Sequence, residues 1–148
     1  LDPEPIAPDI EVPDLPRRGR VESFRVIRDT TITRELKLIY KNKCQICGKT
    51  VILYNRNYSE AHHIKPLGNP HNGADTVENI LILCPNHHVE FDYGAIAIDP
   101  ITMSLIHFDK NNEIHGRPLF LKPGHVINKA CLKYHLENIF KRANNDPA

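Results

Sequence analysis

Apolar residues recur along the chain at spacings that predict several short helices and strands. From Thr31 or Thr33 to near Asn42, apolar positions follow a threonine cap at helical spacing, which predicts a helix. Residues 49–54 and 58–62 lie on either side of the polar turn Asn-Arg-Asn, which predicts two strands. This part of the chain is therefore expected to hold one helix followed by one pair of strands.

The middle of the chain alternates between a turn-rich segment and apolar segments. Residues 66–75 are dense in Gly, Pro, Asn and Asp, which predicts a loop. Residues 77–83 carry an apolar run, and Pro85 is suited to the first turn of a helix that would end at Phe91 or Tyr93. A loop, a buried apolar segment and a helix are expected here in succession.

Short apolar segments and one helical stripe complete the chain. Residues 95–98 and 103–108 flank an Asp-Pro turn, which is consistent with a hairpin. A closing helix is expected over about residues 126–142. Its apolar stripe consists of Ile127, Cys131, Tyr134 and Ile139. The whole pattern predicts an α+β fold with flanking helices and a small hairpin.

The first 16 residues differ from the rest in composition. Residues 1–16 contain five of the twelve prolines, five acidic residues and no basic residue, which predicts an extended linker or arm. We expect residues 17–148 to form one domain, with a short strand near residues 21–27, because the chain is too short for two ordinary cores. Because the sequence begins with Leu and a linker, we expect a fragment or a processed chain, with another domain upstream.

Apolar residues make up 41% of the chain and charged residues 25%, which is typical of soluble globular proteins. No apolar run approaches the length of about 18 residues that a membrane span requires, and no signal-peptide pattern opens the sequence. We therefore expect a soluble cytoplasmic protein.

Charge is distributed unevenly, although the formal net charge is only +1. Residues 17–43 hold nine basic and three acidic residues, which is a net charge of +6. Such a stretch favours contact with phosphate groups, but a solvated helix face rich in Arg and Lys explains it equally well. The candidate phosphate contacts are Arg17, Arg18, Arg20, Arg25, Arg28 and Lys65.

Four positions carry the residue types and the spacing of a zinc site. Cys44 and Cys47 form a CxxC pair, and Cys84 and His87 form a CxxH pair. Zinc favours tetrahedral sites of Cys and His, and structural sites take all four ligands from the protein. The sequence therefore predicts a structural zinc knuckle. His88, which is adjacent to His87, is the alternative fourth ligand.

The cysteines do not indicate a disulfide framework, because their spacing is unlike one and no secretory signal is present. Cys131 lies in the stripe of the closing helix and is expected in the core rather than in the metal site. The simpler interpretation of the other thiols, as buried small side chains, stands beside the zinc interpretation.

Two adjacent histidine pairs lie within this region. His62 and His63 end a predicted strand, and His87 and His88 open a predicted helix. Imidazole is the commonest metal ligand and the usual general base near neutral pH. Adjacent residues of a strand point to opposite faces, so the first two cannot both be core. The histidines without such a context are expected to be surface or structural residues: His71, His107, His115, His125 and His135.

The segments AHHIKPL, VENILILC and CPNHH, in this order, resemble the signature of the HNH endonuclease family. The resemblance covers at least residues 44–92 and implies a ββα-metal finger, in which a hairpin and a helix clasp one divalent ion. The later segments HFDKNNEIHGRPL and YHLENI resemble the C-terminal extension of HNH domains in modification-dependent restriction enzymes. In those enzymes a base-flipping SRA-type reader commonly precedes the nuclease, which implies an upstream DNA-reading domain.

The resemblance implies a role for each residue of the motif. His63 corresponds to the general base, and His62 to the metal ligand that precedes it. Asn79 corresponds to the asparagine that braces the loop and orients the base. His88 corresponds to the last metal ligand, and Asp92, one helical turn later, would complete the shell.

These residue types match what phosphodiester hydrolysis requires. An imidazole with a pKa of about 6.5 activates water, and a catalytic divalent cation (Mg²⁺, Mn²⁺, Co²⁺, Ni²⁺ or Zn²⁺) stabilises the charge on the phosphate and the leaving oxygen. The chemistry is consistent with what the resemblance implies, which is a metal-dependent DNA endonuclease of a restriction or defence system.

As the resemblance implies, the enzyme would leave 5′-phosphate and 3′-hydroxyl ends. The expected partners are duplex DNA, modified or unmodified, and a second copy of the chain in a homodimer. The alternative is a catalytically inactive, zinc-stapled DNA-binding module. A structural domain with two zinc ions has less support, because the sequence offers no second cysteine pair.

Overall fold

The computed structural model describes residues 30–145. The predicted linker at residues 1–16 and the predicted strand near residues 21–27 lie outside the described residues. All described helices and strands belong to one compact unit, Thr31–Ala148. Within residues 30–145, no helix has the length and apolar character that crossing a membrane requires.

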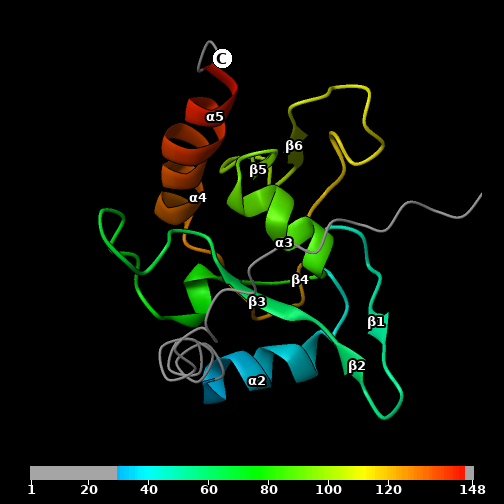
Figure 1. The fold of residues 1–148 in the computed structure, drawn as a ribbon. Coiled ribbons are helices and arrows are strands. Elements are labelled where there is room, and N and C mark those ends of the chain that lie inside the picture. Colours follow the sequence, from blue (N-terminus) through cyan, green and yellow to red (C-terminus); the bar gives the residue numbers. More distant parts are fainter. Residues whose placement is uncertain (1–29, 146–148) are drawn as a thin grey trace, which may run out of the picture. The chain divides into compact units, whose positions relative to one another are not determined.

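Short helices and three pairs of short strands make up this unit (Figure 1). In chain order the elements are α2 (Thr31–Ile39), β1 (Val51–Ile52), β2 (Asn57–Tyr58), β3 (Glu60–His63), η1 (Val77–Asn79), β4 (Ile80–Leu83), α3 (Pro85–Asp92), β5 (Ile96–Ile98), β6 (Leu105–His107), α4 (Lys129–His135), η2 (Leu136–Phe140) and α5 (Lys141–Asn145). This is the predicted α+β fold with helices at both ends.

The antiparallel pair β3–β4 lies at the centre of the unit, between α2 and α3 (Figure 1). All four residues of β4 are completely buried, because both faces of the strand are covered. Ile80 and Ile82 pack with Leu36 of α2, whereas Leu81 packs with Phe91 of α3. Burial of both faces explains why this strand reads as an uninterrupted apolar run rather than as an alternating one.

The prediction of one continuous strand over residues 58–62 is wrong. The chain forms two short strands there, because β2 pairs with β1 whereas β3 pairs with β4. Ser59 lies between them, is buried, and donates a hydrogen bond from its hydroxyl to Asn42 Oδ1 over 2.8 Å. The change of partner at Ser59 separates β2 from β3 and places β3 beside β4.

The helix predicted from Thr31 is confirmed. Its regular part ends at Ile39, and the chain reverses through Lys41 and Asn42, whose φ angles are 53° and 56°. The hairpin predicted over residues 95–108 is also confirmed, as β5 and β6.

The closing helix begins three residues later than predicted. It starts at Lys129 because the side chain of Asn128 accepts hydrogen bonds from the backbone N–H groups of Ala130 and Cys131. Cys131 is buried in the main core, as predicted. The helix then continues through one π-helical turn, η2, into α5.

His135 of α4 is a buried imidazole that packs against α3. Its ring stacks on Phe91 with a centroid separation of 3.7 Å, and its Nε2 donates to the Phe91 carbonyl over 2.9 Å. Its Nδ1 is buried and has no hydrogen-bond partner among the described residues. Burial lowers the pKa of His135 to about 4.

This depressed pKa predicts a loss of stability in acid. His135 takes up a proton at about pH 6.5 in the unfolded chain and only near pH 4 in the folded chain. The contribution of unprotonated His135 to the free energy of unfolding is therefore intact above pH 6.5 and declines as the pH falls toward 4. The loss reaches about 3 kcal/mol. We expect His135→Phe to flatten this part of the pH profile of the free energy of unfolding, measured with urea from pH 7 to pH 4. Because both proteins contain the same other histidines, an unchanged slope would contradict the assignment.

Candidate active site and metal centre

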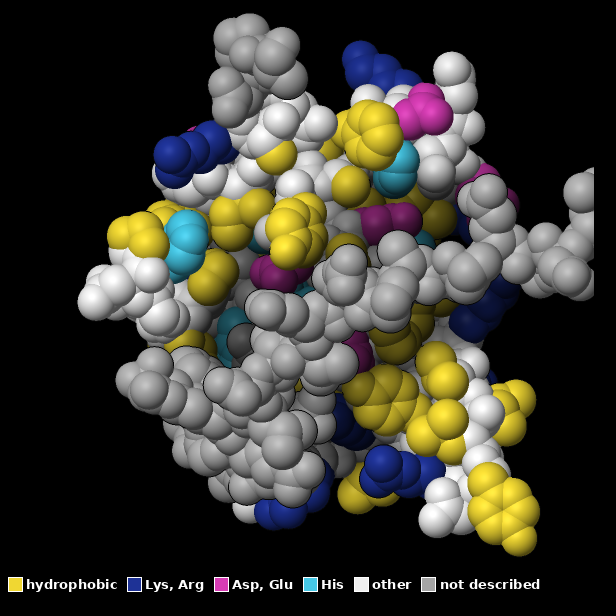
Figure 2. Space-filling model, in the orientation of Figure 1, with side chains coloured by type: hydrophobic (Ala, Val, Ile, Leu, Met, Phe, Trp, Pro, Cys, Tyr) yellow, Lys and Arg dark blue, Asp and Glu magenta, His cyan; other side chains and the backbone are white. Residues whose placement is uncertain are grey.

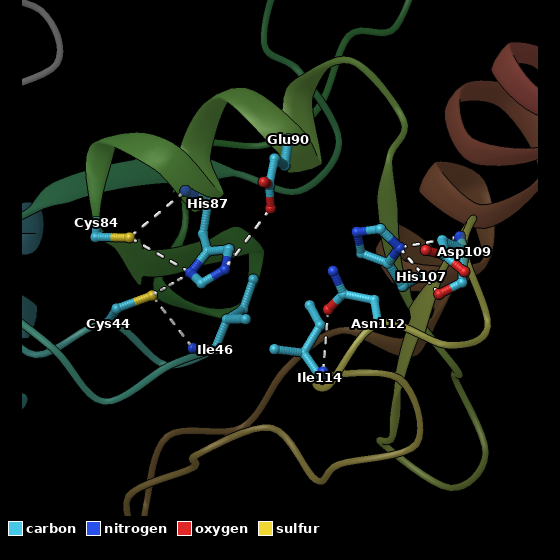
Figure 3. Close-up of polar contacts among 9 residues, drawn as sticks. All are labelled: Cys44, Ile46, Cys84, His87, Glu90, His107, Asp109, Asn112 and Ile114. Carbon is cyan, nitrogen blue, oxygen red and sulfur yellow. Dashed lines mark hydrogen bonds and ion pairs between the residues drawn. The ribbon is translucent and has the colours of Figure 1, made fainter.

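Cys44, Cys47, Cys84 and His87 come together as predicted for the zinc knuckle. Their four candidate ligand atoms all lie within 4.8 Å of one another. His87 Nδ1 is 3.5 Å from Cys44 Sγ and 3.4 Å from Cys84 Sγ (Figure 3). A tetrahedral zinc ion with Zn–S bonds of about 2.3 Å and Zn–N bonds of about 2.0–2.1 Å places its nitrogen and sulfur ligands roughly 3.5 Å apart, so the cluster fits zinc.

Backbone geometry prepares both halves of this cluster. The N–H of Ile46 points to Cys44 Sγ at 3.4 Å, and the N–H of His87 points to Cys84 Sγ at 3.5 Å (Figure 3). Cys84 is the N-cap of α3, with Pro85 in the first turn. The helix start therefore fixes both Cys84 and His87.

Three thiols and one imidazole are the ligand types that zinc prefers, although a metal must displace the thiol protons. Burial raises the pKa of Cys44 to about 12 and also raises the pKa of Cys84, so both thiols hold their protons until a metal displaces them. Burial lowers the pKa of His87, which favours the neutral, ligating imidazole. Its Nε2 lies 3.6 Å from a carboxylate oxygen of Glu90, which orients the ring with Nδ1 toward the sulfurs (Figure 3).

His88, the alternative fourth ligand, points to a different place. Its Nδ1 lies 2.9 Å from Glu60 Oε1, and the hydroxyl of Tyr58 donates to Glu60 Oε2 over 2.6 Å. A carboxylate only accepts hydrogen bonds, so Nδ1 of His88 carries the proton and Nε2 keeps its lone pair. The contact with Glu60 thus leaves the lone pair on His88 Nε2, the nitrogen that could accept a cation.

His62 and His88 lie against each other between β3 and α3. Their ring centroids are 4.6 Å apart, and the His62 ring also contacts Phe91 with a centroid separation of 5.0 Å. His62 is 5% exposed. Because side chains alternate along a strand, Glu60 and His62 share the face of β3 that α3 covers.

His63 points away from that face, toward the loop that follows β3. Its Nε2 lies 2.8 Å from Asp75 Oδ1. Because the carboxylate accepts, Nε2 of the neutral ring carries the proton and Nδ1 is the basic nitrogen. The pair is partly exposed, with 14% of the His63 side chain and 41% of the Asp75 side chain accessible.

Asn79 fastens the loop between these two residues. Its Nδ2 donates to the carbonyls of Lys65 and Ala74, each over 2.9 Å, and its Oδ1 accepts from the N–H of Lys65 over 2.9 Å. Asn79 is 1% exposed. One side chain therefore ties together the two ends of the loop that carries Asp75.

The remaining predicted site residues are placed as follows. Asp92 is exposed on α3 and is not grouped with His62 and His88 in the part of the chain that the structure describes. Lys65 Nζ lies 4.6 Å from the ring centroid of Tyr134. On the face shown in Figure 2, basic and acidic side chains form small groups between apolar ones. The predicted phosphate contacts that lie outside the described residues are Arg17, Arg18, Arg20, Arg25 and Arg28.

Sequence reasoning missed two carboxylates of the site. Glu60 lies two positions before His62, so the strand period could have placed it on the same face. Asp75 lies 12 residues from His63, at the end of a loop rich in glycine and proline. No spacing rule connects Asp75 with His63, because the path of the loop brings them together.

Residues 44–99 match the HNH endonuclease family. This segment contains both the cysteine knuckle and the β3–α3 histidines. Residues 44–99 form an HNH endonuclease domain. The core of this domain coincides with the predicted motif at residues 44–92, and the match also includes β5.

Two relatives of the HNH domain are restriction enzymes. The type IV methyl-directed restriction enzyme EcoKMcrA of Escherichia coli (strain K12) is 33% identical over 87 residues, which cover 57% of this chain and 31% of the relative. The structure of the modification-dependent TagI restriction endonuclease superposes with a TM-score of 0.67 and 38% identity, and covers 76% of this chain and 40% of its own. The chain thus spans less than half the length of either relative.

Proposed function

We propose that this HNH domain hydrolyses phosphodiester bonds of DNA as the cleavage part of a modification-dependent restriction enzyme. The contact between His62 and His88, at 4.6 Å between ring centroids, carries the proposal. Two imidazoles of this kind, with His63 next in the chain, provide a cation site beside a general base. The match to the HNH family and the two restriction-enzyme relatives support the same activity.

His62 and His88 would hold the catalytic cation. Glu60 fixes the proton of His88 on Nδ1, which leaves Nε2 for ligation. We include Asp92 as a third ligand, since it lies one turn after His88 on α3. Mg²⁺, Mn²⁺, Co²⁺, Ni²⁺ and Zn²⁺ are the candidates, and such an ion acts as a Lewis acid on the phosphate and on the leaving oxygen.

His63 would take the proton from the attacking water through Nδ1. Asp75 holds the opposite nitrogen at 2.8 Å, so it keeps the ring in the required tautomer and stabilises the imidazolium formed by proton transfer. Asn79 acts through the backbone, because its three hydrogen bonds hold the loop that presents Asp75.

We further propose that residues 17–148 form the nuclease domain and that residues 1–16 link it to an upstream DNA-reading domain. The two relatives are both longer than this chain and modification- or methyl-directed, which is consistent with a separate reader. A homodimer would supply the second active site needed to cut both strands. The proposed phosphate contacts remain Lys65, Arg17, Arg18, Arg20, Arg25 and Arg28.

A plasmid-nicking assay tests the proposal. The zinc-loaded protein is incubated with modified and unmodified plasmid in each of the candidate cations, beside His63→Ala. We expect cation-dependent nicking by the wild type and a rate at least about 10²-fold lower for His63→Ala, the lower range of general-base contributions. Zinc content and DNA binding should be equal in both proteins.

The alternative function, a zinc-stapled DNA-binding module, predicts a different pattern. It requires salt-sensitive DNA binding by the wild type and no nicking in any of the cations. Equal nicking by the wild type and His63→Ala would contradict the proposed role of His63.

A further inference from the structure

A cavity of about 490 Å³ lies between the end of α2, the knuckle turn and residues 120–122. Three lysines and an aromatic ring line it together with Tyr40 and Gly48: Lys41, Lys43, Lys122 and Phe120. None of the described residues that line the cavity is acidic. The cavity therefore combines positive charge with an apolar wall.

The aromatic ring in this cavity is exposed although its backbone is held firmly. Phe120 is 56% exposed. Its N–H donates to the Gln45 carbonyl over 2.9 Å, and Gln45 Nε2 donates to the Phe120 carbonyl over 2.9 Å. Gln45 is completely buried. A buried amide therefore presents a large apolar side chain to solvent, which folding alone does not require.

The same buried network fixes one of the lysines. The hydroxyl of Tyr40 accepts hydrogen bonds from the Lys122 N–H over 3.2 Å and from Gln45 Nε2 over 3.1 Å. It also bonds to His125 Nδ1 at 2.6 Å. Lys41 is in the left-handed conformation, with φ 53°, at the chain reversal after α2. The backbones of Lys122 and Phe120 are thus preorganised beside the end of α2.

The cavity is separate from the candidate active site. Tyr40 packs with α2 on Ile80 and Ile82 of β4, whereas His62 lies on the side that α3 covers. Figure 1 shows α2 and α3 on opposite sides of the β3–β4 pair. A ligand in the cavity therefore does not occupy the cation site formed by His62 and His88.

We propose that this cavity binds an unpaired nucleotide segment of a nucleic-acid strand. Ammonium groups bind the phosphates, and an exposed aromatic ring stacks on a base, which is the combination that binds single strands. In a duplex the faces of the bases are covered by their neighbours, so a base reaches Phe120 only when it is unstacked. The inference goes beyond the proposed function, because binding here requires neither cleavage nor His63.

Binding of a single-stranded oligonucleotide of about ten nucleotides tests the proposal by fluorescence anisotropy. The full chain is used with zinc bound and no other divalent cation. Phe120→Ala should weaken binding by about tenfold, the value of one base–aromatic stack. Phe120→Leu keeps the apolar bulk but removes the ring, and should weaken binding to a similar extent if the base stacks.

The lysines are tested through salt dependence. Replacing Lys41, Lys43 and Lys122 together by Gln should reduce the slope of log affinity against log salt by about two, because each phosphate contact of a single strand contributes about 0.7. Lys133→Gln and Phe108→Ala are the controls, since both residues are exposed and neither lines the cavity. The controls should bind like the wild type.

Unchanged affinity in both Phe120 variants, or an unchanged salt slope in the lysine variant, would overturn the proposal. So would equal losses in the controls, or tight binding of an acidic peptide with no binding of the oligonucleotide. Plasmid nicking is measured on the same variants. A wild type that binds the oligonucleotide but does not nick would count against the proposed nuclease function and leave this inference standing.

Discussion

Cys44→Ser is expected to unfold the domain rather than merely to empty its zinc site. Cys44 is 1% exposed and belongs to the main core, and the knuckle joins the turn after α2 to the start of α3. Structural zinc contributes about 10–16 kcal/mol of apparent binding free energy in small domains, which equals or exceeds the total stability of about 5–15 kcal/mol. Without zinc, little stability remains for a unit built from strands of two to four residues.

Metal analysis and thermal unfolding followed by circular dichroism check this prediction. The wild type should contain one zinc ion per chain and lose its cooperative transition when a strong chelator is added. Cys131→Ser is the matched control, because Cys131 is also a buried thiol but lies in α4 outside the cluster. We expect the control to keep its zinc and to lose only about 1–2 kcal/mol. A zinc-free Cys44→Ser protein with the wild-type transition would refute the structural role.

Gly73→Ala is expected to disrupt the loop that presents Asp75. A Cβ at Gly73 would lie 1.9 Å from the carbonyl oxygen of Lys65 and 2.9 Å from that of Pro66, so the backbone itself must move. The Gly73 N–H also donates to the Pro66 carbonyl over 2.7 Å. We expect a loss of about 3 kcal/mol or more in the free energy of unfolding.

The same substitution should lower nicking by about 10²-fold or more. The displaced Lys65 carbonyl is a partner of Asn79, and an error of about 1 Å in a catalytic group has this effect on rate. Gly68→Ala in the same loop is the control, since no atom lies within 4 Å of the Cβ that it would add. If both variants unfold and nick alike, the close approach at Gly73 has no importance.

The sequence was sufficient for those parts of the fold that depend on local pattern. The helix after Thr31, the hairpin at residues 95–108 and the knuckle were all foreseeable, because spacing and turn chemistry are local properties. Spacing alone left His87 and His88 as competing zinc ligands. The structure separates them, because His87 contacts the cysteine sulfurs whereas His88 contacts the carboxylate of Glu60.

Features that depend on chain path were not foreseeable. At Ser59 the chain changes its pairing strand from β1 to β4. This change depends on where β4 lies in the fold and not on the residues around position 59. The contact between His63 and Asp75 needs the folded loop, and the cavity beside Phe120 needs a segment about 75 residues from Gln45. Each brings together residues whose separation carries no periodic signal.

The first turn of α3 couples ion binding at the zinc cluster to ion binding at the proposed catalytic site. His87 belongs to the zinc cluster and His88, the next residue, to the proposed catalytic site. An ion at either site would restrict the same peptide unit. The chain would then lose less conformational entropy when the second ion binds. Coupling of this kind is reciprocal, so zinc occupancy would raise the affinity of the proposed catalytic cation by the same factor by which that cation would raise the affinity for zinc.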